Sequence, residues 1–71
     1  MVDINLLKTT IDESGMTLKA VAKRAGIPYH TLCRRLHGHG DFSADEIVGL
    51  TRALRLKVSE RNDIFLRDSV N

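Results

Sequence analysis

Apolar residues recur along this 71-residue chain at the three- and four-residue spacing of amphipathic helices. Glycines, one proline and short polar stretches divide this pattern into five segments. No stretch shows the strong apolar–polar alternation of a β-strand. We therefore predict an all-α fold in a single domain over residues 1–71, with helices at about 4–14, 17–25, 28–37, 44–54 and 60–67.

Residues 16–38, MTLKAVAKRAGIPYHTLCRRLHG, predict two helices joined by a tight turn. Thr17 is a suitable N-cap for the first helix, and Gly26 suits the left-handed residue that ends it. Ile27 follows as an apolar plug of the corner. Pro28 fits the first turn of the next helix, where its missing N–H has no partner to lose. This pattern is typical of a helix-turn-helix, which can present its second helix to the DNA major groove.

The other helix boundaries carry capping residues of their own. Asp3 is the expected N-cap of the first helix, and Gly15 ends it. Ser43 and Glu46 have the spacing of a capping box at the start of the fourth helix. Ser59 is the expected N-cap of the last helix.

The inward-facing apolar positions of these five helices define the expected core. Leu32 and Leu36, at i and i+4, anchor the second helix of the motif and leave its opposite side to polar groups. The full set of expected core residues is Ile4, Leu7, Ile11, Val21, Ala25, Ile27, Leu32, Leu36, Phe42, Ile47, Leu50, Leu54, Val58 and Ile64.

The basic residues are concentrated on the helix-turn-helix. Residues 14–40 contain five Lys and Arg residues and neither Asp nor Glu, which gives a formal charge of +5. Residues 1–13 carry −2 and residues 41–71 carry −1, so the whole chain has a net charge of only +2. Such an asymmetry indicates a nucleic-acid binder. The alternative is a solvated charged surface, which is common in soluble proteins.

The run TLKAVAKRAGIPYHTLCRRLHG resembles the helix-turn-helix of the Cro/lambda-repressor (XRE-type) family. The matching features are Ala22, Gly26 four residues later, Ile27 after it, and Leu32. The resemblance covers about residues 4–66 and implies a compact five-helix domain. The TLCRRLHG run, followed by a loop and the FSADE helix start, is similar to small phage or actinobacterial regulators of this family, which implies a regulator of phage or prophage type.

This sequence departs from the family's pattern at three places. Leu18 stands where many relatives carry a Gln that contacts a DNA phosphate, so that contact is not expected here. Arg35 occupies a position that is often apolar and buried. Arg55 lies near the place where relatives often end the fourth helix with Gly.

The outward side of the helix at 28–37 supplies the candidate base-contacting residues. Arg34 is the best candidate because its fork-shaped guanidinium matches O6 and N7 of guanine. The alternative for Tyr29 is a ring that covers Ile27, and the alternative for His30 and His37 is plain solvent exposure. The candidate base-contacting set is Tyr29, His30, Cys33, Arg34 and His37.

A second set of residues is expected to contact DNA phosphates or to contribute to the positive field. These side chains carry no sequence information themselves but position the protein on the duplex. The alternative for each of them is solvated surface. The set is Thr17, Lys19, Lys23, Arg24, Thr31 and Arg35.

A metal site was weighed for His30, Cys33, His37 and His39, because imidazole and thiolate suit zinc or copper. All four belong to one exposed helix and the loop after it. No carboxylate is nearby to orient the imidazoles. We therefore predict no metal and no cofactor.

Other features of the sequence limit the classes of function that the protein can have. There is no nucleophile–base motif, phosphate-binding Gly loop or paired carboxylates in an apolar setting, so no enzyme is expected. Cys33 is the single cysteine, which fits a reducing compartment. The chain has neither an apolar run of membrane-spanning length nor the features of a signal peptide at its N-terminus. We expect a cytoplasmic protein that needs no membrane.

These observations predict a sequence-specific double-stranded DNA-binding protein, a transcriptional repressor or Cro-like regulator that places residues 28–37 in the major groove. One alternative is an excision or directionality factor on the same scaffold, and another is an antitoxin-type protein-interaction module. Ile64, Phe65 and Leu66 are consecutive, so one helix face cannot bury all three. We expect Phe65 or Leu66 to be exposed and to support a weak homodimer through this segment and the tail.

Overall fold

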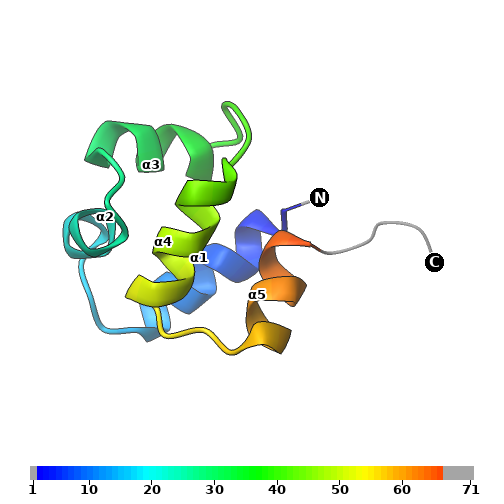
Figure 1. Cartoon of the computed structure of the whole chain (residues 1–71). Coiled ribbons are helices and arrows are strands. Elements are labelled where there is room, and N and C mark those ends of the chain that lie inside the picture. Colours follow the sequence, from blue (N-terminus) through cyan, green and yellow to red (C-terminus); the bar gives the residue numbers. More distant parts are fainter. Residues whose placement is uncertain (1, 67–71) are drawn as a thin grey trace.

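The computed structural model describes residues 2–66 and contains only helices and connecting loops in that range. The all-α prediction is therefore confirmed. The predicted bounds of the first four helices agree with the structure to within about one residue. The helices are α1 (Ile4–Glu13), α2 (Leu18–Ala25), α3 (Tyr29–Leu36), α4 (Ala44–Ala53) and α5 (Val58–Phe65) (Figure 1).

Three predicted N-caps are confirmed. Asp3 Oδ1 accepts a hydrogen bond from the Leu6 N–H at 3.0 Å. Thr17 Oγ1 accepts one from the Ala20 N–H at 3.1 Å. Ser43 and Glu46 form a full capping box, in which each side chain accepts from the other residue's N–H at 3.2 and 2.9 Å. These bonds satisfy N–H groups that have no partner within their helix.

The prediction for the last helix was wrong in its start. The helix begins at Val58, with Lys57 rather than Ser59 as its N-cap. The Lys57 N–H donates to Glu60 Oε1 at 2.7 Å, which is the half of a capping box in which the first turn reaches back to the N-cap residue. Residue 67, the predicted end of this helix, lies outside the described residues.

The core follows the predicted apolar positions closely. Val58 is the clear exception, because its place in the first turn of α5 leaves it 64 % exposed. Ile4 is only half-buried, whereas Leu6 packs against the core. Ala25, Phe42, Ile47 and Leu54 are also half-buried. The predicted residues that are buried are Leu7, Ile11, Val21, Ile27, Leu32, Leu36, Leu50 and Ile64.

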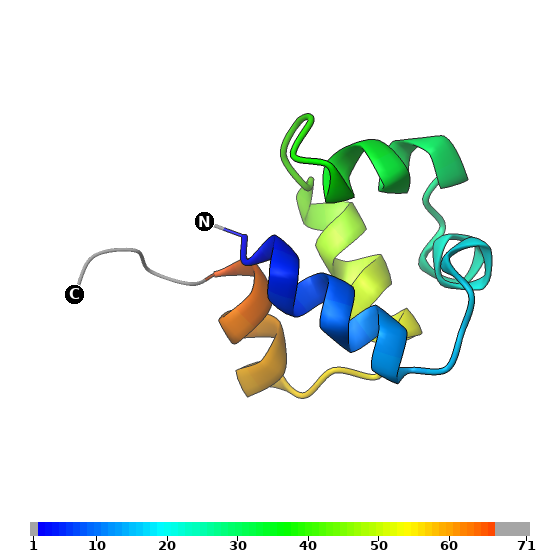
Figure 2. The same ribbon diagram turned by 180° about the vertical axis from the view of Figure 1, so that it is seen from behind.

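The end of α5 is packed against the body of the protein. Phe65 is buried, and its ring meets that of Phe42 edge-on with centroids 5.6 Å apart. The Asp3 N–H donates to the Ile64 carbonyl at 2.7 Å, which joins α5 to the start of α1 (Figure 2). Of the three consecutive apolar residues, Leu66 alone is exposed, at 60 %, while Phe65 is not.

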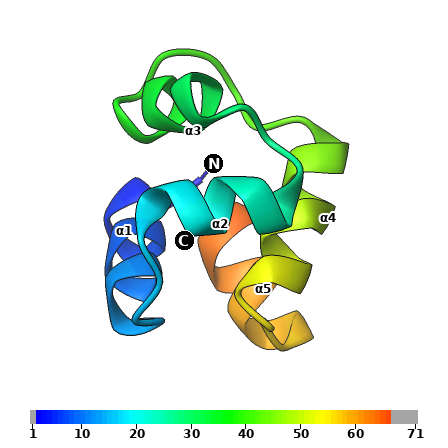
Figure 3. The ribbon, with the colours of Figure 1, turned by 90° about the vertical axis from the view of Figure 1, so that its left-hand side faces the viewer.

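Gly49 lets α4 approach α2 closely. A Cβ atom at Gly49 would collide with the carbonyl oxygen of Ala25, at the C-terminal end of α2. The backbone contact therefore requires a residue without a side chain. It fixes the end of α2 from which the chain turns into α3. The helix α3 then lies across one end of the molecule, with the other four helices on one side of it (Figure 3).

Candidate nucleic-acid interface

The corner between α2 and α3 is built as the sequence predicts. Gly26 has φ +72°, in the left-handed region that favours glycine. The Ile27 N–H donates to the Ala22 carbonyl at 3.0 Å, and the Ile27 side chain is buried. Leu32 and Leu36 fix the inner side of α3 in the core. The helix is held from below, which leaves its outer side free.

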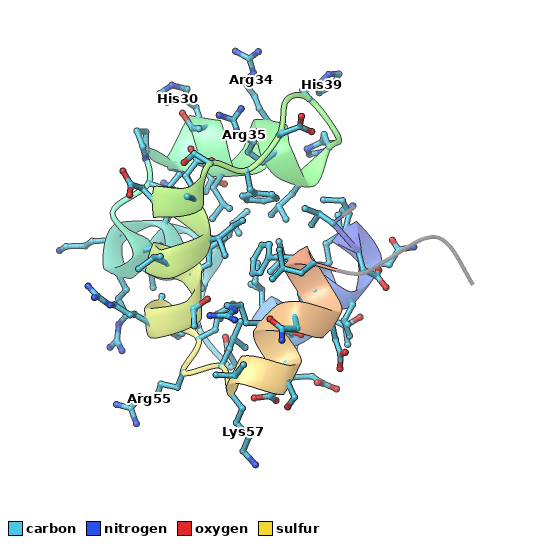
Figure 4. The ribbon with its side chains drawn as sticks, turned by 45° about the vertical axis from the view of Figure 1, so that its right-hand side comes forward. His30, Arg34, Arg35, His39, Arg55 and Lys57 are labelled. Carbon is cyan, nitrogen blue, oxygen red and sulfur yellow. The ribbon has the colours of Figure 1, made fainter. Side chains whose placement is uncertain are left out.

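His30 and Arg34 lie on that outer side. Both are exposed, and Figure 4 shows their side chains pointing away from the rest of the protein. His39, in the loop after α3, points away from the protein at the same end (Figure 4). The sequence pattern indicated His39 only as a candidate metal ligand. Its place beside α3 depends on the loop conformation, which residue spacing did not reveal.

Tyr29 and Cys33 occupy the flank of α3. The Nζ atom of Lys19 lies 5.5 Å from the centroid of the Tyr29 ring, which links the start of α2 to the start of α3. The Cys33 side chain raises the pKa of the Tyr29 hydroxyl above its ordinary 10.0, first through a hydrogen bond and then through its charge. Cys33 itself is half-buried.

His37 is held against the end of α3. Its Nδ1 lies 2.8 Å from the carbonyl oxygen of Cys33. A carbonyl oxygen only accepts, so Nδ1 carries the proton and Nε2 is left for another partner. His37 and Cys33 also line an apolar hollow of about 350 Å³, together with Lys8 and Asp12 of α1 and four apolar side chains.

Arg35 is engaged within the protein. Its Nε lies 3.3 Å from Glu46 Oε1, and its Nη1 donates to the His39 carbonyl at 3.4 Å. The same Glu46 oxygen accepts the Ser43 N–H of the capping box. The phosphate contact predicted for Arg35 is therefore not supported by its surroundings. Instead this ion pair, here called the Arg35–Glu46 clamp, ties α3 to α4 and braces the loop between them.

The predicted phosphate contacts on α2 point to two sides. Lys19 and Lys23 are four residues apart and share the helix face next to Tyr29. Arg24 instead lines a hollow of about 300 Å³ with Leu54 and Arg55, and no residue of α3 lines it. The geometry therefore favours Lys19 and Lys23 over Arg24 as contacts beside α3.

The remaining candidates are less prominent. Thr17 is exposed, and its oxygen accepts the Ala20 N–H, which leaves the hydroxyl hydrogen free to donate. Thr31 is half-buried. Apart from Arg35, no cation of residues 14–40 has an ion-pair partner in the described part of the chain.

Two other kinds of site were sought in residues 2–66. No three His, Cys, Asp or Glu side chains there come close enough to hold a metal ion, so His30, Cys33, His37 and His39 are not brought together. None of the helices has the length and apolar character needed to cross a membrane.

Comparison with protein-family models, curated proteins and solved structures finds no match for this chain. The strongest geometric feature is the outer side of α3, with His30 and Arg34 exposed and Lys19 next to Tyr29 at its start.

Proposed function

We propose that this chain binds double-stranded DNA in a sequence-specific way, with α3 in the major groove. The observation that supports this proposal most is that Arg34 and His30 project from a helix whose inner side is fixed in the core. An α-helix with its side chains is about 10–12 Å across, which fits a major groove about 12 Å wide. The surrounding segment 14–40 carries five cations and no carboxylate.

Each side chain has a distinct role in this proposal. Arg34 donates two hydrogen bonds to O6 and N7 of a guanine. His30 contacts a base edge or a phosphate near the start of α3. Lys19 and Lys23 neutralise phosphates beside the groove. Tyr29, whose ring lies next to Lys19, offers its hydroxyl to a phosphate or its ring to a thymine methyl. No chemical step takes place at this surface.

The regulatory role follows from the resemblance to the Cro/lambda-repressor family. We propose that the protein occupies an operator as a repressor or Cro-like regulator of phage or prophage type. Occupation of attachment sites instead of promoters would identify an excision factor. Stable co-purification with a second protein chain would favour an antitoxin-type module.

Selection of bound duplexes from a random DNA pool tests the proposal directly. Wild-type protein is expected to enrich a short motif, and Arg34→Ala to lose preference at one position of it, a G·C pair. Arg55→Ala is the matched control, because Arg55 lies at the far end of the molecule from α3 (Figure 4). Enrichment of no motif by the folded wild-type protein would refute sequence-specific binding.

Salt dependence tests the phosphate contacts separately. With roughly four phosphates neutralised per protomer, log K against log salt is expected to have a slope of about −3 to −4. Lys23→Ala should reduce the slope by about one and weaken binding to all duplexes alike, whereas Lys57→Ala should leave it unchanged. Binding that is insensitive to salt would contradict the proposed surface.

The homodimer remains a proposal, in a modified form. Ile64 and Phe65 are buried in the protomer, so the exposed apolar residues in and directly after α5 are Val58 and Leu66. The tail at 67–71 lies outside the described residues. Sedimentation of wild type and Leu66→Arg, with and without DNA, tests this contact. A single protomer on an unrepeated site would contradict the dimer and leave DNA binding intact.

A further inference from the structure

All three histidines of the chain lie in α3 or within three residues of its end, next to the proposed DNA-binding surface. His30 is in α3, His37 is its C-cap, and His39 follows in the loop. All three are exposed. Figure 4 shows His30 and His39 projecting at the same end of the molecule as Arg34. Histidine is the side chain whose charge ordinarily changes between about pH 5 and pH 8.

Contacts with the backbone fix two of these histidines in place. His37 Nδ1 donates to the Cys33 carbonyl at 2.8 Å, which leaves Nε2 for another partner. The backbone of His39 is held by the Arg35–Glu46 clamp, because Arg35 Nη1 reaches the His39 carbonyl. Gly40 leaves room for the Arg35 side chain, since a Cβ atom at this position would lie 2.6 Å from Arg35 Nη1.

No carboxylate pairs with these histidines. Among residues 2–66, none of the three forms an ion pair or a side-chain hydrogen bond with Asp or Glu. His37 shares its hollow with Lys8 and Asp12 of α1, which are of opposite sign. Charged side chains of both signs lie on the three helices around α3. They are Lys8, Asp12 and Glu13 of α1, Lys19, Lys23 and Arg24 of α2, and Asp45, Glu46 and Arg52 of α4. In the loop after α3, Asp41 lies two residues beyond His39.

We propose that DNA binding by this surface is linked to protonation, so that the affinity for duplex DNA rises as the pH falls. This inference rests on the proposed function and adds regulation to the same site. When the three imidazoles are protonated, the formal charge of residues 14–40 rises from +5 to +8. A neutral imidazole with an acceptor nitrogen gains little from a phosphate, whereas an imidazolium both attracts it and donates to it.

The direction of the effect follows from linkage. A nearby opposite charge favours the protonated imidazole by about tenfold or more, so the complex holds more protons than the free protein. Binding must then tighten on acidification. If two or three of the histidines meet phosphates, the Kd is expected to fall by about 100-fold or more between about pH 8 and pH 5.5.

The test measures the Kd of a labelled duplex of about 20 base pairs, two turns of B-DNA, across this pH range. A mixed-sequence duplex serves as the probe, because phosphate contacts do not depend on sequence. Ionic strength is held constant, and EDTA is present to exclude metal binding by the histidines. Circular dichroism at each pH confirms that the helices are intact. The variants are the three single His→Gln substitutions and the combination H30Q/H37Q/H39Q, which keep polar side chains but cannot become cationic.

Wild type should show the steep pH dependence, each single variant a smaller one, and the triple variant almost none. Arg34→Gln is the matched control: it should weaken binding at every pH and retain the pH dependence. A wild-type Kd that is salt-dependent but constant with pH would refute the proton linkage and leave the proposed function standing. Full pH dependence in the triple variant would also refute it. Absence of duplex binding at any pH would refute both.

Discussion

The two ends of this molecule both expose cations, but their surroundings differ. At one end, Arg34 projects from α3 within a segment that has no acidic residue (Figure 4). At the other end, Arg55 and Lys57 directly precede α5, a helix that contains Glu60 and Asp63. Glu60 is already used to cap the Lys57 N–H. Exposed positive charge alone is therefore weak evidence for a DNA-binding site. A rigidly held helix with unbalanced cations is stronger evidence.

The largest loss of stability is expected at the contact between α4 and the end of α2, because this contact positions α3. Gly49→Ala would force a Cβ atom into the Ala25 carbonyl oxygen, and backbone cannot move aside as a flexible side chain can. We expect a loss of about 2–3 kcal/mol in the free energy of unfolding. Chemical denaturation measures it, with Val48→Ala, an exposed position on the same helix, as the control near zero. Equal stability of both variants would show that α2 and α4 are not in contact at Gly49.

The difference between the ends is tested most simply by two Arg→Ala substitutions. Arg34→Ala should weaken binding to the selected duplex by about 1–3 kcal/mol, roughly 5- to 150-fold, because two hydrogen bonds to a base are lost. Arg55→Ala removes the same charge at the far end and should change Kd by less than about twofold. Fluorescence anisotropy gives both values. Equal changes in Kd for the two substitutions would mean that DNA binding depends on the net charge of the protein and not on the position of Arg34.

A smaller effect is expected from the Arg35–Glu46 clamp. Glu46→Ala removes the ion pair with Arg35 and half of the capping box with Ser43. We expect a loss of about 1–2 kcal/mol in the free energy of unfolding, most of it from capping, since the ion pair is partly exposed. Asp45→Ala in the same helix turn is the control, with a loss below about 0.5 kcal/mol. Comparable losses for the two would mean that Glu46 acts only through the helix dipole.

The smallest effect is expected at Arg55. Its φ of +53° lies in the left-handed region, where a side chain is unfavourable and glycine is common after a helix. Arg55→Gly should therefore stabilise the fold by up to about 1 kcal/mol without changing the affinity for DNA. Thermal unfolding and the anisotropy titration measure the two quantities. A destabilised variant would indicate that the Arg55 side chain stabilises the fold by more than its strained backbone costs.

The sequence was sufficient for the fold because local signals and apolar spacing agreed. The caps at Asp3, Thr17 and Ser43 and the left-handed Gly26 were all identifiable from residue type and position. The start of α5 was missed because a Glu at the third helical position capped it without a serine at the cap itself. Val58 was consequently placed in the core, although it is exposed.

The candidate site was less predictable, because it depends on contacts between helices. Helical spacing placed His30 and Arg34 on the outer side of α3, and the structure agrees. It could not show that Arg35 is engaged with Glu46, eleven residues away, or that Arg24 lines the same hollow as Arg55. A glycine within the apolar pattern of α4 was the available sign of the close contact at Gly49.

Amide chemical shifts, followed as the selected duplex is added to isotope-labelled protein, test the central claim most directly. The account predicts shifts concentrated in α3, in the loop that carries His39 and around Lys19, with little change from Arg55 to Asp63. Shifts centred on Arg55, Lys57 and α5, with α3 unaffected, would contradict it.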